Sequence, residues 1–160
     1  MSVIESIAYA ISARSRQRKF SQFLTLIDPQ PNDTIIDVGV NTIEYSDTDN
    51  YLEKFYTNPS RITALGQGDF TDFRKRYPAV TAVPGDGRTL PFADSAFDIA
   101  YSNAVIEHVG TRDDQRRFLA ELFRVSHRGY LTTPNKYFPI ELHTRLPLLH
   151  LLLSKTNFDR

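Results

Sequence analysis

Two short motifs that combine an acidic residue with glycine stand where β-branched runs of this sequence end. Asp37-Val38-Gly39-Val40-Asn41 closes the first run, and Gly85-Asp86-Gly87 follows a later one. A carboxylate accepts hydrogen bonds from amino groups, and a neighbouring glycine lets a flat ring lie against the backbone. The later motif therefore predicts a site for a ring that carries an amino group, whereas the first is typical of many strand-to-helix turns.

Glu107 and His108 follow the fourth predicted strand and are the candidates for acid–base chemistry. Imidazole has an ordinary pKa of ~6.5, which suits a proton acceptor near neutral pH. The alternative is a structural role, in which the pair hydrogen-bonds the adjoining loop. Glu141 and His143 form a second pair, which belongs either to a lid over the same face or to a surface loop. The spacing of these four residues matches no metal-ligand motif, so no metal site is expected.

Five short, mainly apolar runs alternate with helical patterns and would position these motifs. The strands are predicted over residues 34–40, 61–65, 80–83, 97–102 and 129–133. Apolar residues recur at helical spacing between them, over 51–56, 70–77 and 112–125. This alternation predicts an α/β fold with a parallel sheet and helices on both faces. Because such sheets bind ligands at the carboxyl ends of their strands, the motifs are expected to meet there.

Polar residues mark where two of these helices begin. Thr111 with Asp114 three residues later resembles a capping box and would start the last helix. The helix over 51–56 is predicted to begin through one of three polar residues, Ser46, Asp47 or Thr48.

The N-terminal segment, residues 1–31, is predicted to contain two helical stretches. Residues 3–11 have apolar side chains at helical spacing, and residues 20–27 form the second stretch. The basic cluster between them, over residues 14–19, is expected on a solvated helix face.

The 160 residues are predicted to form a single domain, with a core over 34–135 and a C-terminal lid or helix over 136–160. The formal net charge is 0, so the chain has no excess of positive charge that would favour nucleic-acid binding. Cysteine is absent, and the longest apolar stretch, Leu146–Leu153, falls far short of the ~20 residues that span a bilayer. We expect a cytoplasmic protein that binds neither nucleic acid nor membrane.

A series of motifs resembles one known family. Gly85-Asp86-Gly87-Arg88-Thr89-Leu90-Pro91-Phe92 is followed by Phe97-Asp98, by Glu107-His108 and, after the fifth strand, by Thr132-Thr133-Pro134-Asn135. This series resembles the class I S-adenosylmethionine-dependent methyltransferases, in particular their small-molecule branch. The resemblance covers residues 34–135. It implies a Rossmann-like, doubly wound, mainly parallel sheet with strand order 3-2-1-4-5, in which the family's last two strands are missing.

The resemblance also implies that S-adenosylmethionine is the cofactor and that a small molecule accepts the methyl group. The positions that match the family's cofactor-binding motifs are Asp37, Gly39, Val40, Asn41, Gln67, Asp86, Gly87, Ser102, Asn103 and Ala104. Glu107 and His108 lie near the expected position of the methyl group and are the candidate catalytic residues.

Two regions depart from the family's pattern. Asn41 and Ile43 stand where the family has glycine, so the loop is expected to take a different path. Gln67 stands where the family usually has a carboxylate for the ribose, and Asp69 comes two residues late; the loss would weaken cofactor binding by ~1 to 3 kcal/mol. A degenerate domain with an interaction or scaffolding role is therefore the alternative function. A nicotinamide-dependent enzyme is disfavoured, because Gly-x-Gly-x-x-Gly is absent after the first strand.

A sheet that stops at its fifth strand leaves an apolar edge that needs a cover. The segment Leu146–Leu153 could cover this edge. A second copy of the chain could cover it as well, which would make the protein a homodimer.

Overall fold

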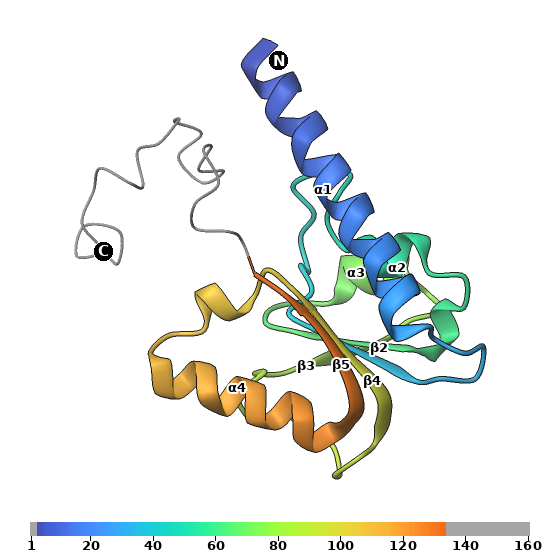
Figure 1. The fold of residues 1–160 in the computed structure, drawn as a ribbon, viewed down its shortest axis with the longest axis vertical. Helices are drawn as coiled ribbons and strands as arrows, with labels where there is room; N and C mark the ends of the chain where they lie inside the picture. Colours follow the sequence, from blue (N-terminus) through green and yellow to red (C-terminus); the bar gives the residue numbers. More distant parts are fainter. Residues whose placement is uncertain (1–2, 134–160) are drawn as a thin grey trace.

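Five parallel strands form one sheet in the order β3-β2-β1-β4-β5, which confirms the predicted α/β class and the implied strand order. The structure is a computed structural model and describes residues 3–133. Each strand overlaps a run that the sequence predicted, and Figure 1 shows how the strands lie side by side. Their bounds are β1 (Ile35–Val38), β2 (Ile62–Gly66), β3 (Thr81–Pro84), β4 (Phe97–Asn103) and β5 (Ser126–Thr132).

The central strand β1 is apolar on both faces because helices cover both. Ile35 and Ile36 point to opposite faces and are both 0% exposed. Ile35 lies opposite Ile62 of β2 and Ile99 of β4, so the middle of the sheet is a continuous β-branched layer. This layer fixes the register that brings the carboxyl ends of β1, β2 and β4 to one side.

Helices flank the sheet on both sides, as in a doubly wound fold (Figure 1). On one face, Phe23, Leu52 and Phe73 pack into the core from three different helices. On the other face, Phe118 and Leu122 pack from a single helix. The helices are α1 (Val3–Ile27), α2 (Tyr51–Phe55), α3 (Thr71–Arg76) and α4 (Arg112–Val125), with short 3₁₀ turns η1 (Pro59–Arg61) and η2 (Ile106–His108).

The N-terminal segment forms one continuous helix, so the prediction of two separate stretches was wrong. Arginine and lysine are good helix formers, so the basic cluster over 14–19 does not interrupt α1. Phe23 anchors this helix on the sheet: its ring lies 5.1 Å from that of Tyr101 and 5.6 Å from that of Tyr130. Arg16 is not solvated as expected, because it reaches Asp49.

The helix starts were predicted with mixed success. The capping box of α4 is confirmed: Thr111 Oγ1 accepts from the N–H of Asp114 at 3.2 Å, and Asp114 Oδ2 accepts from the N–H of Thr111 at 3.0 Å. Helix α2 begins at Tyr51, where the predicted range begins, but Asn50 precedes it in place of Ser46, Asp47 or Thr48. The polar side chains of residues 46–48 do not cap it, because they belong to a loop that runs from residue 39 to 50.

Several predictions concern residues 134–160, which lie outside the described residues. They are the C-terminal lid or helix, the Glu141 and His143 pair, and the apolar segment Leu146–Leu153. Among residues 3–133, β5 pairs with β4 and with no other strand. No described helix is both long enough and apolar enough to cross a membrane.

Candidate functional site

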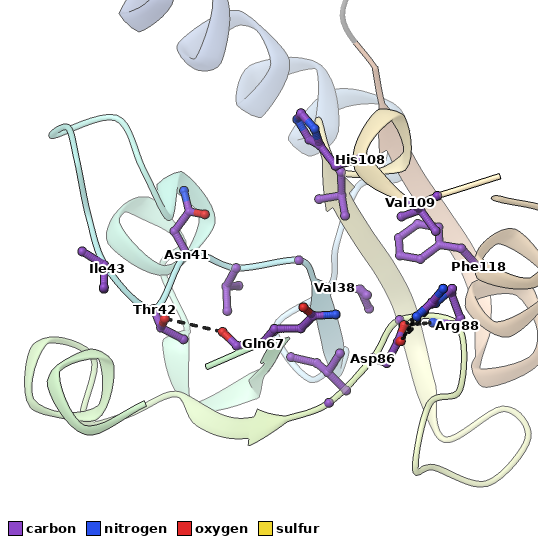
Figure 2. A pocket seen from close by; sticks show the side chains of 18 of the residues that line it. Val38, Asn41, Thr42, Ile43, Gln67, Asp86, Arg88, His108, Val109 and Phe118 are labelled. Carbon is purple, nitrogen blue, oxygen red and sulfur yellow. Dashed lines mark hydrogen bonds and ion pairs between the residues drawn. The ribbon is translucent and has the colours of Figure 1, made fainter. Parts of the chain in front are cut away.

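A cavity of about 430 Å³ opens at the carboxyl ends of β1, β2 and β3, where the strand order predicts a ligand. It is bounded by the turn after β1, the end of β2, the turn after β3, and η2 with α4. Figure 2 shows Gln67 and Asp86 on one side of this cavity and His108 on the opposite side. The lining residues are Val38–Ile43, Tyr45, Leu65–Gln67, Gly85–Arg88, Val105, His108–Gly110 and Phe118.

Gly39 turns the chain out of β1 into the cavity wall. Its φ is 105°, a conformation that residues with a side chain rarely adopt. A Cβ atom here would lie 2.3 Å from Cγ2 of Val105, which is closer than two carbon atoms can approach. The N–H groups of Gly39 and Val40 both donate to the carbonyl of Leu65, at 2.7 and 3.2 Å. This turn therefore needs glycine, and it lets η2 pack directly against the end of β1.

Asn50 holds the part of the loop where the sequence lacks further glycines. Its Oδ1 accepts from the N–H of Asn41 at 2.9 Å, and its Nδ2 donates to the carbonyl of Asn41 at 2.8 Å. Asn50 itself has a φ of 50°, which asparagine tolerates better than most residues. Neither Asn41 nor Ile43 is among the described residues with a positive φ. The backbone strain expected for a β-branched residue at position 43 therefore does not arise.

Two acidic side chains fix the rest of the loop, and the first is Asp49. Its Oδ2 accepts from the N–H groups of Tyr45 and Ser46, at 2.8 and 3.1 Å. Its Oδ1 pairs with the guanidinium of Arg16 at 3.1 Å. The same guanidinium donates to the carbonyl of Thr48. Helix α1 is thereby tied to the loop that lines the cavity.

The second acidic side chain is Glu44. Its carboxylate pairs with Lys54 at 3.2 Å and with Arg76 at 3.1 Å, and it accepts a hydrogen bond from the hydroxyl of Tyr77. Burial on its own raises the pKa of Glu44, but the hydrogen bonds from Tyr77, Lys54 and Asn50 outweigh it, so the pKa lies below its usual value. The loop is therefore held to α2 and α3 by an ionised carboxylate.

The end of β2 contributes Gln67 to the cavity, as predicted. Thr42 Oγ1 donates to the carbonyl of Gln67 at 3.5 Å and so links the ends of β1 and β2 (Figure 2). Asp69 does not replace the missing acidic residue. Its carboxylate accepts from the N–H and the hydroxyl of Thr71, at 2.9 and 2.7 Å, and so fixes the start of α3 outside the cavity lining.

The turn after β3 brings Asp86 and Gly87 to the cavity, again as predicted. The Asp86 carboxylate forms an ion pair with Arg88 at 2.6 Å (Figure 2). Arg88 reaches on to Asp114 at 3.2 Å. Hydrogen bonds from Arg88 hold the pKa of Asp86 below its usual value. At Gly87, a Cβ atom would lie 2.5 Å from the ring of Phe118, so the backbone packs directly against α4.

The end of β4 contributes less to the cavity than predicted. Ser102 is 1% exposed, and its hydroxyl donates to the carbonyl of Val38 at 2.8 Å, which joins β4 to β1. Asn103 Oδ1 accepts from the hydroxyl of Thr132 at 2.6 Å and faces the ammonium of Lys19 at 3.4 Å. Neither residue lines the cavity, and nor does Ala104, which has a φ of 58°.

Glu107 and His108 both lie on η2, but they face different surroundings. His108 is exposed and lines the cavity. Glu107 lies outside the lining and faces the hydroxyl of Thr133 at 3.5 Å. Its other oxygen, Oε1, is buried and has no hydrogen-bond partner among the described residues. The geometry thus separates the two candidates, with His108 beside the cavity and Glu107 behind it.

Asp37 lies beneath the cavity and not in its lining. It is 7% exposed, and the side chain of Glu53 on α2, which is 4% exposed, lies within hydrogen-bonding reach of it. Burial, together with this second carboxyl, raises the pKa of Asp37 well above its usual value. Asp37 is therefore not positioned to contact a ligand in the cavity.

Sequence reasoning missed several residues of this site. Arg88 is part of the recognised motif, but its pairing with Asp86 has no sequence signal of its own. Asn50 and Glu44 act across the loop, and nothing in the periodicity of the chain marks them. The apolar wall of Val105, Val109 and Phe118 depends on how η2 and α4 pack. Among residues 3–133, no group of three or more His, Asp, Glu or Cys side chains could hold a metal ion.

Comparison with known proteins identifies a family. The methyltransferase domain family matches residues 53–132, which is half of the chain. No curated protein matches the sequence.

Solved structures share the fold at low sequence identity. A SAM-dependent methyltransferase from Aquifex aeolicus has a TM-score of 0.55 and 16% identity, over 83% of this chain and 74% of that one. One from Methanosarcina mazei has a TM-score of 0.53 and 21% identity, over 68% and 55%. The YcgJ protein from Bacillus subtilis has a TM-score of 0.53 and 17% identity, over 69% and 46%. This chain therefore spans about half the length of the last two proteins. The family match and the shared fold show that the chain belongs to the methyltransferase domain family.

Proposed function

We propose that this chain binds S-adenosylmethionine in the cavity and transfers a methyl group to a small-molecule acceptor. The observation that carries the proposal is that one cavity collects the predicted residues from three strand ends. They are Gly39, Val40 and Asn41 after β1, Gln67 after β2, and Asp86 and Gly87 after β3, with His108 opposite. The cavity volume of about 430 Å³ lies within the usual range for cofactor sites. When bound, the cofactor supplies a methyl group activated by a sulfonium charge.

The turn after β1 suits the ammonium group at the amino-acid end of the cofactor. The N–H groups of Gly39 and Val40 donate to Leu65, and that of Asn41 donates to Asn50. These donors are therefore taken, and this part of the turn meets a ligand through its carbonyl oxygens. Carbonyl oxygens accept hydrogen bonds, so they favour an ammonium group over a carboxylate.

The turn after β3 suits the adenosine end. The Asp86 carboxylate has about four acceptor positions, and Arg88 directs its backbone N–H, its Nε–H and an Nη2–H at them, with the Nε–H shared between the two oxygens. An amino group on a ring would therefore share a carboxylate oxygen with these donors. Leu65 and Phe118 supply apolar surface for the ring. Gln67 can exchange one hydrogen bond with a ribose hydroxyl, which is a weaker contact than two carboxylate oxygens would make.

His108 is the better placed of the two candidate catalytic residues. It lines the cavity, so its imidazole can accept the proton that an oxygen or nitrogen acceptor loses on methylation. Glu107, which lies behind the cavity, would instead orient η2 through Thr133. Once a methyl acceptor has been identified, His108→Ala should lower kcat by about 10²-fold or more, whereas Glu107→Gln should change kcat much less. Equal losses in the two variants would contradict this division of roles.

A non-catalytic interaction or scaffolding domain is the second candidate. The observation that favours it is the ion pair between Arg88 and Asp86, because Arg88 occupies much of the Asp86 carboxylate. If this occupation excludes a ligand, the domain keeps the fold and loses the cofactor. The two candidates therefore differ in whether the folded chain binds a cofactor analogue.

Partners other than the methyl acceptor are a separate part of the proposal. The formal net charge of 0 offers no attraction to nucleic acid. Among the described residues, β5 is an edge strand; Leu131 on this strand is 36% exposed, and Phe123 on the neighbouring helix α4 is 72% exposed. A second copy of the chain pairing at this edge would form a homodimer, and light scattering in solution tests it.

Calorimetric titration with S-adenosylhomocysteine, the demethylated product, tests the proposed function. We expect micromolar binding to the wild type and a Kd at least about tenfold higher for Asp86→Ala. Asp72→Ala is the matched control, because Asp72 lies on α3, is exposed and pairs with Lys75 away from the cavity. Absence of binding at millimolar ligand, in protein that is folded by circular dichroism, would favour the scaffolding role.

A further inference from the structure

Two carboxylic acid side chains are buried together beneath the cavity. Asp37 of β1 is 7% exposed and Glu53 of α2 is 4% exposed. They lie within reach of a mutual hydrogen bond. Like charges at this depth repel strongly, because water screens them little.

No ion pair among the described residues offsets the free-energy cost of burying the carboxyl of Glu53. Both of its carboxyl oxygens are buried and have no hydrogen-bond partner among the described residues. Two ionised carboxylates cannot bond to one another, since each only accepts hydrogen bonds. A single proton on either residue converts the contact into a donor–acceptor pair, so a shared proton accounts for this arrangement.

The neighbouring cations pair with other carboxylates, so they do not neutralise the Asp37–Glu53 pair in place of that proton. Lys54, the cation on the same helix, pairs with Glu44 at 3.2 Å, and Arg16 of α1 pairs with Asp49 at 3.1 Å. Burial raises the pKa of Glu53 to about 7, and it also raises the pKa of Asp37. The titratable and charged groups that act on the pair or on its tyrosine neighbours come from α1, the loop, α2, α3 and the residue after it, β4 and β5. They are Arg16, Glu44, Lys54, Arg76, Tyr77, Tyr101 and Tyr130.

The pair stands at the two ends of the loop that lines the cavity. Asp37 comes two residues before Gly39, whose turn forms the cavity wall. Glu53 comes three residues after Asn50, which holds Asn41 by two hydrogen bonds. A bond between the two carboxyls therefore joins the strand before the loop to the helix after it.

We propose that Asp37 and Glu53 share one proton and that this bond positions the loop of residues 39–50 for the ligand in the cavity. Glu53 is then a positioning residue, which acts through Asp37 and touches no ligand. The proposal rests on the proposed function for the identity of that ligand. Loss of the proton places two charges in contact and pushes β1 and α2 apart, so ligand affinity falls as the pair ionises.

The first experiment needs no ligand and tests the shared proton itself. It measures the urea midpoint of unfolding from pH 5 to pH 8. A folded-state pKa that is raised above the unfolded value gives stability below the unfolded pKa, and this stability is lost as the pH rises through the folded pKa of about 7. The wild-type midpoint should therefore fall across this range, and that of Glu53→Gln should fall less, because the amide donates to Asp37 without titrating.

Two further variants make this measurement decisive. Asp37→Asn places the amide on the other partner and should also flatten the profile, so the test survives if one variant does not fold. Glu121→Gln is the matched control, because Glu121 lies on α4, which packs on the other face of the sheet. The hydrogen bond from Arg124 lowers the pKa of Glu121, so its contribution is lost only in more acidic solution, and the variant's profile should run nearly parallel to the wild type from pH 5 to pH 8. Parallel profiles for wild type, Glu53→Gln and Asp37→Asn would overturn the shared proton.

The second experiment measures the Kd for S-adenosylhomocysteine over the range pH 6 to pH 9. If binding requires the shared proton, the wild-type Kd should rise by up to about tenfold per pH unit above pH 7, while that of Glu53→Gln should stay within about twofold. The same pH dependence in both proteins would overturn the positioning role. Absence of binding at every pH would overturn the proposed function and the positioning role with it, whereas the urea profiles would still decide whether the proton is shared.

Discussion

The carboxylate of Glu121 on α4 accepts a hydrogen bond from the backbone N–H of Leu90 at 2.6 Å. Arg124, one turn further along the helix, completes the contact by donating to the carbonyls of Leu90 at 3.0 Å and Phe92 at 2.8 Å. Arg124 also pairs with Glu121 itself at 2.7 Å. The Leu-Pro-Phe part of the recognised motif is therefore clamped to α4, and the clamp holds the turn that carries Asp86.

Removal of this clamp should destabilise the fold. Arg124→Ala leaves the carbonyls of Leu90 and Phe92 without their donor and Glu121 without its cation, so we expect a loss of about 2 kcal/mol in the free energy of unfolding. The control is Arg116→Ala, which removes only an exposed pair with Asp113 and should cost less than about 0.5 kcal/mol. Urea denaturation of the two variants measures both values. Equal losses would show that the clamp adds no stability.

Replacement of Asn50 should loosen the loop in two separable steps. Asn50→Gly keeps the left-handed backbone and removes the two hydrogen bonds to Asn41, for a cost of about 1 to 2 kcal/mol. Asn50→Ala adds the strain of a positive φ, about 1 kcal/mol more. Both variants should bind S-adenosylhomocysteine more weakly than the wild type. An Asn50→Gly protein with wild-type affinity would show that Asn50 does not support the cavity.

The variant Arg88→Ala discriminates between the two candidate functions. If Arg88 orients the Asp86 carboxylate for a ligand, its removal should raise the Kd for S-adenosylhomocysteine by about three- to tenfold. If Arg88 instead blocks that carboxylate, affinity should increase or binding should appear for the first time. The measurement is a calorimetric comparison with the wild type at the same pH and salt.

Asp98 should make a pH-dependent contribution to stability. Its carboxylate accepts from the N–H and the hydroxyl of Thr34, both at 2.8 Å, and the backbone hydrogen bond leads in holding its pKa below the usual value. A lowered folded-state pKa gives stability above the unfolded pKa, and this stability is lost as the pH falls through the folded value. Asp98→Asn should therefore cost about 1 to 2 kcal/mol at pH 7 and much less near pH 3. A difference from the wild type that does not change with pH would contradict this.

The sequence predicted those parts of the fold that depend on local patterns. The short apolar runs and the Thr111 capping box are local signals, so all five strands and the start of α4 were found. Gly39, Gln67 and Asp86, which follow β1, β2 and β3, line one cavity, and their role in cofactor binding stays a prediction.

Side-chain contacts across long separations could not be predicted in this way. The predicted entry to α2 through residues 46–48 was wrong because Asn50 and Asp49 hydrogen-bond the loop, which is a tertiary effect that no helix-start signal contains. The burial of Glu53 beside Asp37 has the same origin, since an acidic residue on a short helix ordinarily faces water. Ser102 and Asn103 were assigned to the cofactor by motif position, whereas their side chains bond to neighbouring strands.

The most direct test of the account is a ¹H–¹⁵N NMR titration of the wild-type protein with S-adenosylhomocysteine. It reports in one experiment whether the ligand binds and where. We expect saturable shifts at the amides of Gly39, Gln67 and Gly87, with little change at the exposed end of α3 near Asp72. Absence of shifts at millimolar ligand, or shifts confined to residues outside the cavity, would contradict the assignment of this cavity to the cofactor.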